Sequence, residues 1–325
     1  MRVAIIGCGT MGHLHASMAA ACGLKIIACG DKYKHHAKVL AEPYGAAASD
    51  DSMAVIADPE VDIVAICSPT PTHAGYAIAA AEAGKSIFCE KPFARTVRQC
   101  RDVMAAARKA KVKLFVAHVV RYFQEFEAMR AQLAAGKVGK PGFVKLYRGG
   151  LFPMGIDGWF RDYGQSGGVT LDSMIHDIDW LRYTFGDAER VFCQALRRGE
   201  PEAIDYSMAT FRMKSGVIAK VIGTWAQPGG FRVETEICGD KGMLQFNSDE
   251  TPIFTMKRTA PGETPSTIVP ASPVPKSPYQ LEWEEFLAWV RDTRQPRVTA
   301  RDATEAVRMA LAALESAETG KPVKL

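Results

Sequence analysis

Three side chains suited to acid–base chemistry occur in two short segments of this chain. Lys91 stands within Glu90-Lys91-Pro92, directly after the apolar run 87–89, and Asp172 and His176 are four residues apart. A neutral imidazole can accept a proton near neutral pH, and an ammonium group stabilises negative charge on an oxygen. These residue types therefore indicate removal of a hydroxyl proton from an alcohol, with Asp172 assisting. The alternative is structural, with Asp172 in a first helical turn and His176 packed in a core.

The elements expected around these residues explain how they would meet. Lys91 would follow a strand at its carboxyl end, where parallel sheets bind ligands. If 172–176 is helical, the spacing puts Asp172 and His176 on one helical face. Gly167-Gly168 precede them and have the backbone freedom for a close approach to a bound ligand.

Two patterns of apolar residues predict two domains. In residues 1–120, short apolar runs alternate with Ala-rich stretches at helical spacing, which is typical of βαβ units. Strands are expected at 3–6, 25–29, 63–67, 86–89 and 113–117, and helices at 11–21, 33–44, 72–83 and 97–110. Residues 121–325 show the period-2 alternation of an antiparallel sheet. There we expect strands at 144–148, 191–196, 205–211, 217–224, 233–238 and 242–246, a hairpin turn at 239–242, helices at 124–135, 279–292 and 300–319, and an exposed loop at 259–278.

A glycine-rich segment at the N-terminus predicts a dinucleotide site. Gly7-Cys8-Gly9-Thr10-Met11-Gly12 follows the first expected strand and opens the first expected helix. Gly7 would permit the tight turn, Gly9 would let the backbone approach a diphosphate, and Gly12 would allow close packing of the helix on the strand. Thr10 and Met11 would place their amides at the positive helix end, next to the anion.

Asp31 and Lys32 bear on the choice between NAD and NADP. Asp31 ends the second expected strand, where an acidic residue hydrogen-bonds the adenosine ribose. Its charge repels a 2′-phosphate and favours NAD, whereas Lys32 could swing toward such a phosphate, so NADP use stays open. The alternative is that Asp31 caps the next turn.

A loop after the third expected strand completes the predicted cofactor contacts. Ser68, Pro69 and Thr70 lie in this loop, which two prolines restrict, and they could lie under the nicotinamide ribose. His73 is expected as a helix-start or packing residue beside the cofactor. Glu90 is expected to orient Lys91 or its loop.

Composition narrows the class of protein. With 47% hydrophobic and 23% charged residues and a formal charge of +4, the chain is typical of a globular protein and lacks the basic stripe of a nucleic-acid binder. It contains no apolar stretch near the ~18 residues of a membrane span and no secretory signal pattern. Its eight scattered cysteines form no Cys-x-x-Cys pair, so we expect reduced thiols, a cytoplasmic location and no metal site.

The chain resembles the Gfo/Idh/MocA oxidoreductases over essentially its whole length. The resemblance rests on the glycine-rich segment, 70–73, 83–85, Glu90-Lys91-Pro92, and Gly167-Gly168 followed by Asp172 and His176. It implies an N-terminal Rossmann domain (1–120) and a C-terminal α/β domain (121–325) with a large open sheet that often forms oligomer contacts. The substrate would lie between the domains. We therefore expect a homodimer or homotetramer formed through the C-terminal sheet.

The resemblance also implies roles for individual residues. Lys91, Asp172 and His176 take the positions of the catalytic residues and would contact the substrate, with the histidine as the general acid/base and the lysine on the reacting oxygen. Other residues fall on segments near the expected substrate: Arg121, Arg148, Asp157, Trp159 and Arg161. Trp159 could stack on a sugar ring or pack beneath its loop, and the arginines could bind hydroxyls or a carboxylate. Asp177 and Asp179 are expected to be solvated helix charges, although Asp179 could lie near the cleft.

The expected function is that of an NAD(P)-dependent dehydrogenase. It would interconvert a secondary alcohol and a ketone, or an aldose and a lactone, on a sugar, inositol or related polyol. Two alternatives remain, an NAD-dependent glycoside hydrolase of related fold and a non-catalytic NAD(P)-binding sensor. The hydrolase would form no net NADH, and a sensor would have no need of the acid–base set.

Overall fold

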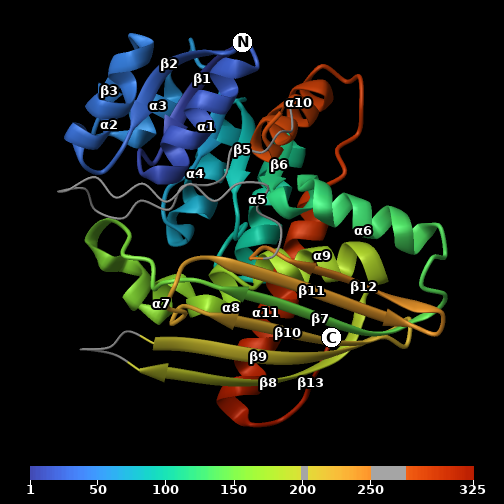
Figure 1. The fold of residues 1–325 in the computed structure, drawn as a ribbon. Helices are drawn as coiled ribbons and strands as arrows, with labels where there is room; N and C mark the ends of the chain where they lie inside the picture. Colours follow the sequence, from blue (N-terminus) through green and yellow to red (C-terminus); the bar gives the residue numbers. More distant parts are fainter. Residues whose placement is uncertain (199–203, 250–275) are drawn as a thin grey trace, which may run out of the picture.

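The computed structural model describes residues 1–198, 204–249 and 276–325. Within these ranges two sheets form separate layers, and helices pack against each of them (Figure 1). The predicted α/β class, a parallel-sheet domain followed by a domain with a mostly antiparallel sheet, is confirmed.

The first sheet has six parallel strands in the order β3-β2-β1-β4-β5-β6. They span β1 (Arg2–Ile6), β2 (Lys25–Gly30), β3 (Ala47–Ser49), β4 (Ile63–Ile66), β5 (Ser86–Glu90) and β6 (Leu114–Ala117). Their near-continuous apolar runs are explained because both faces of the sheet are buried. The strand order reverses between β1 and β4, so the carboxyl ends of these strands border the position where such sheets bind ligands. The sequence did not reveal β3, since three small residues carry no alternation.

Helices cover both faces of the first sheet. Those on one face are α1 (Thr10–Ala21), α2 (Lys34–Ala41) and α10 (Pro278–Val290), and those on the other are α3 (Ser52–Ala57), α4 (Thr70–Glu82) and α5 (Val97–Ala110). The helix expected at 33–44 ends earlier, in a 3₁₀ turn at Glu42–Tyr44, and α3 was not predicted. Although α10 is distant in sequence, Trp283 stacks on Phe88 of β5 with ring centroids 4.2 Å apart. The segment predicted as the second domain therefore supplies a helix to the first sheet.

The second sheet has seven strands among the described residues, in the order β12-β11-β7-β10-β9-β8-β13. They span β7 (Pro141–Gly149), β8 (Ala188–Arg198), β9 (Ile204–Met213), β10 (Ile218–Thr224), β11 (Arg232–Gly239), β12 (Gly242–Asn247) and β13 (Val323–Lys324). Neighbours are antiparallel except β7 and β10, which are parallel. The predicted hairpin turn joins β11 to β12, where Gly239 pairs with Gly242.

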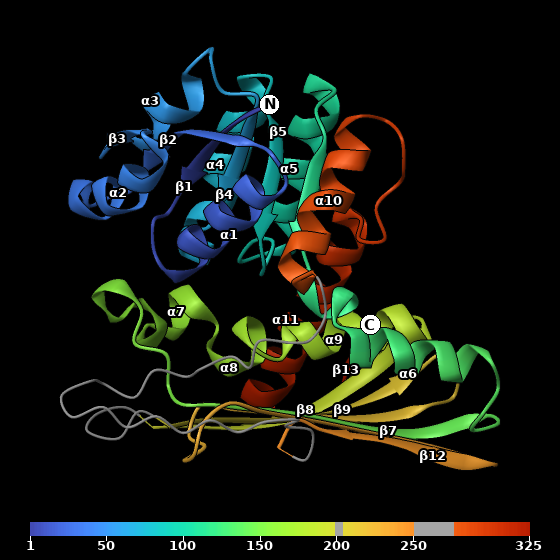
Figure 2. The ribbon, with the colours of Figure 1, turned by 45° about the horizontal axis from the view of Figure 1, so that its top comes forward.

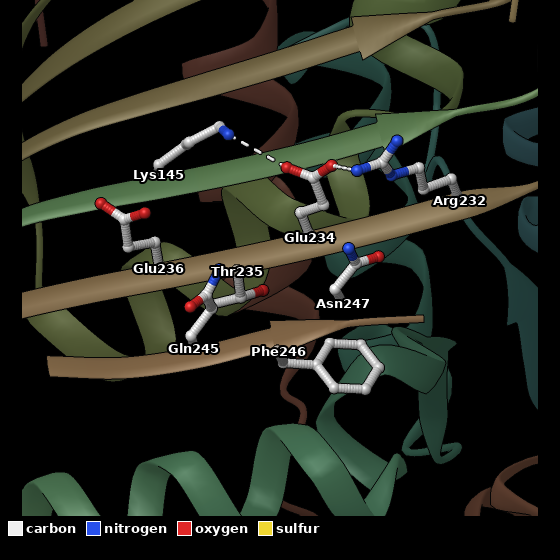
Figure 3. A pocket seen from close by; sticks show the side chains of 8 residues that line it. All are labelled: Lys145, Arg232, Glu234, Thr235, Glu236, Gln245, Phe246 and Asn247. Carbon is white, nitrogen blue, oxygen red and sulfur yellow. Dashed lines mark hydrogen bonds and ion pairs between the residues drawn. The ribbon is translucent and has the colours of Figure 1, made fainter. Parts of the chain in front are cut away.

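Among the described residues, helices cover one face of the second sheet and leave the other face bare (Figure 2). The covering helices are α6 (Gln124–Ala134), α8 (Gly168–Asp172), α9 (Ile175–Phe185) and α11 (Ala300–Thr319). On the bare face, Glu234 of β11 lies between Lys145 and Arg232 beside a hollow of about 180 Å³ (Figure 3). The alternation of buried and exposed residues along β9 reflects these two environments.

The remaining segments connect the two layers. They are the 3₁₀ turns η2 (Val119–Tyr122) and η3 (Ile156–Arg161) and the short helix α7 (Tyr163–Ser166). α11 packs on β8 and α9 of the second layer and on α5 of the first. The loop predicted at 259–278 lies, up to residue 275, outside the described residues. Among the helices of the described part, none has the length and apolar character that crossing a bilayer requires.

Candidate active site

Lys91 directly follows β5 and contacts Asp172 at the end of α8. Its Nζ donates to the backbone oxygen of Asp172 at 3.0 Å and lies 3.4 Å from Oδ1 of the same residue. Both side chains are largely shielded, with 16% of each exposed. This contact joins the first domain to the second and holds the ammonium group at the carboxyl end of the parallel sheet.

The helix that carries Asp172 does not continue to His176, contrary to the helical arrangement considered from the spacing. α8 ends at Asp172, Ser173 and Met174 form a turn, and α9 begins at Ile175. The two side chains therefore belong to different helices. Asp172 and His176 therefore do not share one helical face.

His176 lies at the start of α9, is partly buried, and has positively charged groups near it. Desolvation lowers its pKa well below the usual 6.5, and the nearby cationic groups of Lys91 and Arg148 lower it further. Its Nδ1 is buried and has no hydrogen-bond partner among the described residues. The imidazole is therefore neutral near pH 7, which is the form that accepts a proton.

The Glu90 side chain is oriented by His15, which is itself hydrogen-bonded to Trp283. Sequence reasoning missed both His15 and Trp283. Its Oε2 accepts a hydrogen bond from the Lys91 backbone amide at 2.8 Å, and its Oε1 lies 2.7 Å from His15 Nε2. Trp283 Nε1 donates to His15 Nδ1 at 3.1 Å, so Nε2 carries the proton in a neutral His15 and donates to Glu90. His15, Glu90 and Trp283 are all buried. The position of His15, three residues after Gly12, is the only sequence signal for this chain of hydrogen bonds.

The glycine-rich turn has the geometry that a diphosphate requires. Gly7 has φ +89°, and a Cβ there would lie 2.4 Å from the backbone nitrogen of Ser68. A Cβ on Gly12 would lie 2.1 Å from the Gly7 oxygen. At Gly9, by contrast, a Cβ would meet only the Ile156 side chain, at 3.8 Å, so the backbone there is open to a bound group. The amides that open α1 have no partners within the helix and are available to an anion.

The Asp31 carboxylate caps the turn after β2. Its carboxylate accepts hydrogen bonds from the backbone amides of Cys8 and Tyr33, each at 2.8 Å. The residue is 7% exposed and follows β2, at the end expected to meet the adenosine ribose. A carboxylate has further acceptor sites, so shaping the turn is compatible with accepting a ribose hydroxyl.

His73 ties the loop after β4 to the loop after β5. Its Nε2 lies 2.7 Å from the Ser68 oxygen and its Nδ1 lies 2.8 Å from the Pro92 oxygen. Thr70 begins α4 directly after Pro69, and His73 is 1% exposed. The structure thus places His73 in a packing role, as the sequence favoured, next to the segment that carries Lys91.

Comparison with known families agrees with this geometry. Residues 1–118 match the model of an oxidoreductase family with an NAD-binding Rossmann fold, and residues 126–245 match the Gfo/Idh/MocA C-terminal domain. This chain belongs to the Gfo/Idh/MocA oxidoreductase family. It is an NAD-binding oxidoreductase.

Relatives of this Gfo/Idh/MocA protein cover most or all of its length. The scyllo-inositol 2-dehydrogenase (NAD(+)) of Bacillus subtilis strain 168 is 28% identical over 342 residues, covering 100% of this chain and 96% of the relative. The 1,5-anhydro-D-fructose reductase of Ensifer adhaerens is 31% identical over 281 residues, covering 83% and 82%. The crystal structure of GenD2 from gentamicin A biosynthesis, in complex with NAD, has a TM-score of 0.90 at 23% identity, covers 100% of this chain and 96% of GenD2, and shows the same fold.

The predicted solvation of Asp177 and Asp179 was wrong, because both are 1% exposed. Asp177 accepts two hydrogen bonds from Arg148, at 2.8 and 2.9 Å. Asp179 accepts two from Arg121, at 2.7 and 2.6 Å. Neighbouring elements supply the buried partners, which a helical pattern alone does not reveal.

The structure does not favour Arg121 as the predicted substrate contact. Its side chain is 1% exposed, and its guanidinium also donates to the backbone oxygen of Arg297 at 2.6 Å. Arg148 is likewise engaged by Asp177, although its charge acts on His176. Through these ion pairs, both arginines stabilise the packing around His176.

The other predicted substrate residues lie on η3. Trp159 is partly buried and its ring centroid is 4.0 Å from that of Phe160, while Arg161 is exposed. Asp157 contacts Lys32 and Tyr33, which follow Asp31 at the end of β2. The segment predicted to contact substrate therefore also reaches the first domain.

Proposed function

We propose that this protein oxidises a hydroxyl-bearing carbon of a sugar, inositol or related polyol with NAD⁺, or catalyses the reverse reduction. The reaction would convert a secondary alcohol to a ketone, or a cyclic aldose to its lactone. The observation that carries this proposal is the placement of Lys91 on Asp172, beside a partly buried His176 with a lowered pKa.

His176 would remove the hydroxyl proton during oxidation and return it during reduction. Lys91 would stabilise the negative charge that develops on the substrate oxygen, because Asp172 holds its ammonium group in a shielded position. Asp172 acts by fixing Lys91. NAD, when bound, supplies the hydride acceptor, and the amides at Gly9, Thr10 and Met11 and the Asp31 carboxylate would hold its diphosphate and ribose.

The substrate class rests on the relatives and on the residues near the site. The named relatives act on an inositol and on an anhydro sugar, and both substrates carry several hydroxyl groups. Trp159 and Arg161 would contact such a ring from η3. A glycoside hydrolase and a non-catalytic sensor are less well supported, since both relatives are named for a redox reaction and the full acid–base set is present.

The bare sheet face supports a proposal of self-assembly. Large apolar side chains are exposed on three of its strands, namely Phe192, Tyr206, Met208 and Ile218. Several large apolar side chains exposed on one sheet face are typical of protein interfaces. We propose a homo-oligomer that buries this face, acting in the cytoplasm, where the eight free thiols stay reduced.

The test is NADH formation, followed by absorbance, with purified protein across inositols, aldoses, sugar acids and glycosides. NADP⁺ is assayed in parallel. Substrate-dependent NADH is the expected result. Release of an aglycone from a glycoside without net NADH would replace the proposal with a glycoside hydrolase, and cofactor binding with no turnover on any compound would favour a sensor.

The matched variant for this assay is His176→Gln. It removes the titratable group at nearly constant volume, so we expect unchanged NAD⁺ binding and a loss of roughly 10²–10⁴-fold in kcat. Full turnover by this variant would refute the role of His176 in proton transfer.

A further inference from the structure

The η3 segment belongs to the second domain but contacts the turn after β2 in the first. Asp157 Oδ2 accepts a hydrogen bond from Lys32 Nζ at 3.0 Å, and the Tyr33 hydroxyl lies 2.9 Å from both carboxylate oxygens. Figure 2 shows the chain before α7 projecting from the second layer toward the first domain. A single carboxylate makes these contacts, and Asp157 lies 125 residues after Lys32 in the sequence.

The neighbouring residue extends this contact to the glycine-rich turn. Ile156 Cδ1 lies 3.8 Å from the position that a Cβ on Gly9 would occupy. Ile156 and Asp157 therefore span the distance from the diphosphate-binding turn to the end of β2. These are the two regions of the first domain that hold the adenosine half of a dinucleotide.

The backbone conformation at Asp157 directs its side chain toward Lys32. Asp157 has φ +59° and Gly158 has φ +62°, so both adopt the left-handed conformation. Aspartate and asparagine tolerate this conformation better than other residues with a side chain. The carboxylate is thus presented to Lys32 by a conformation that asparagine would preserve.

The charges at this end of the site are nearly all engaged. Asp31 binds two backbone amides, and His36 Nδ1 lies 3.6 Å from its carboxylate. Lys34 pairs with Asp50 at 3.9 Å. Lys32 is the cation next to Asp31 that could bind a 2′-phosphate, and its ammonium is held by Asp157.

We propose that Asp157 is a specificity-determining residue that disfavours NADP by occupying Lys32, the cation beside Asp31. A 2′-phosphate would have to displace the Asp157 carboxylate before it could bind the Lys32 ammonium group. Discrimination would therefore come from both domains. This inference rests on the dinucleotide site of the proposed function.

The test measures binding of NAD⁺ and NADP⁺ to the full-length protein by calorimetry, without substrate. For Asp157→Asn we expect the Kd for NADP⁺ to fall by about tenfold, which is 1.4 kcal/mol, with a change of less than about twofold for NAD⁺. In a Lys32→Met background the same substitution should leave the ratio of the two Kd values unchanged.

Two control variants separate this effect from general ones. Asp292→Asn alters another aspartate that has a positive φ, of 56°, and pairs with a lysine, Lys113, and it should not change either Kd. Ile156→Ala should weaken both cofactors by the same factor, because its contact with Gly9 does not distinguish them.

Three results would overturn the proposal. An unchanged ratio of Kd values in Asp157→Asn would show that the carboxylate does not discriminate. A shift that persists in the Lys32→Met background would show that discrimination does not act through Lys32. Failure of the unaltered protein to bind NAD⁺ would refute the cofactor site itself, and with it both this proposal and the proposed function.

Discussion

The backbone oxygen of Asp172 lies 3.0 Å from the ammonium nitrogen of Lys91, across 81 residues of sequence. The contact makes the end of α8 part of the same site as the end of β5. It means that the position of Lys91 depends on how the two domains dock.

Removing either partner of this contact should reduce turnover. For Lys91→Met we expect kcat to fall by roughly 10²–10³-fold, because the developing alkoxide loses its cation. Asp172→Asn should have a smaller effect, since the backbone oxygen still binds Lys91. Steady-state kinetics with the substrate found in the panel measures both, with the exposed Glu318→Gln as control. A larger loss in Asp172→Asn than in Lys91→Met would contradict the assigned roles.

The pH profile of oxidation should report the lowered pKa of His176. Oxidation requires the neutral imidazole, and burial together with Lys91 and Arg148 holds its pKa well below 6.5. Activity should therefore persist below pH 6.5 and fall only in more acidic solution. In Lys91→Met the pKa should rise, which shifts the acidic limb of kcat/KM toward higher pH. An acidic limb that stays fixed between these proteins would exclude His176 as its source.

Substitutions at His15 should affect kcat more than cofactor affinity. His15→Ala leaves Glu90 without its buried donor, which disturbs the loop that carries Lys91. We expect a fall in kcat with little change in the Kd for NAD⁺, and partial recovery in His15→Gln, whose amide can donate to Glu90. Trp283→Phe, which keeps the stacking on Phe88, should have a smaller effect. Equal loss of turnover and of thermal stability in His15→Gln and His15→Ala would favour a purely structural role.

The raised pKa of Asp205 predicts how the free energy of unfolding changes with pH. Burial raises its pKa to about 6 from 3.8, while Val169 N–H donates to its Oδ2 at 2.7 Å. A raised folded-state pKa gives a contribution that is complete below pH 3.8 and is lost as pH rises through about 6. Relative to Asp205→Asn, the free energy of unfolding should therefore decrease between these pH values, by up to about 3 kcal/mol. Urea denaturation at several pH values measures this difference, and a constant difference would refute it.

Disrupting the bare sheet face should dissociate the oligomer. Ile218 is 44% exposed on β10, and Ile218→Glu would place a charge in the proposed interface. We expect a smaller particle by light scattering coupled to size exclusion. Val39→Glu, at an apolar residue of α2 that is 60% exposed, is the matched control and should leave the mass unchanged. A monomeric unaltered protein would refute the proposed assembly.

Local patterns were sufficient where neighbouring residues decide the structure. The glycine-rich segment predicted the first turn because Gly7 and Gly12 meet backbone atoms that exclude a Cβ. Apolar runs predicted β1, β4 and β5, since their residues are buried on both faces. Glu90-Lys91-Pro92 and the downstream Asp172 and His176 predicted the family to which the chain belongs. These features persist in the sequence because each depends on local conformation or on a fixed set of residue types.

Only the tertiary structure decided which partners these residues have. Periodicity shows that one side of α9 is buried but not that Arg121 and Arg148 meet its aspartates there. It also gave no sign that Trp283 would reach His15, or that Asp157 would reach Lys32. Such contacts join residues that are far apart in sequence, so they follow from the docking of whole elements. The sequence by itself determined the chemistry available to this oxidoreductase, and the packing of its two domains decided where that chemistry is assembled.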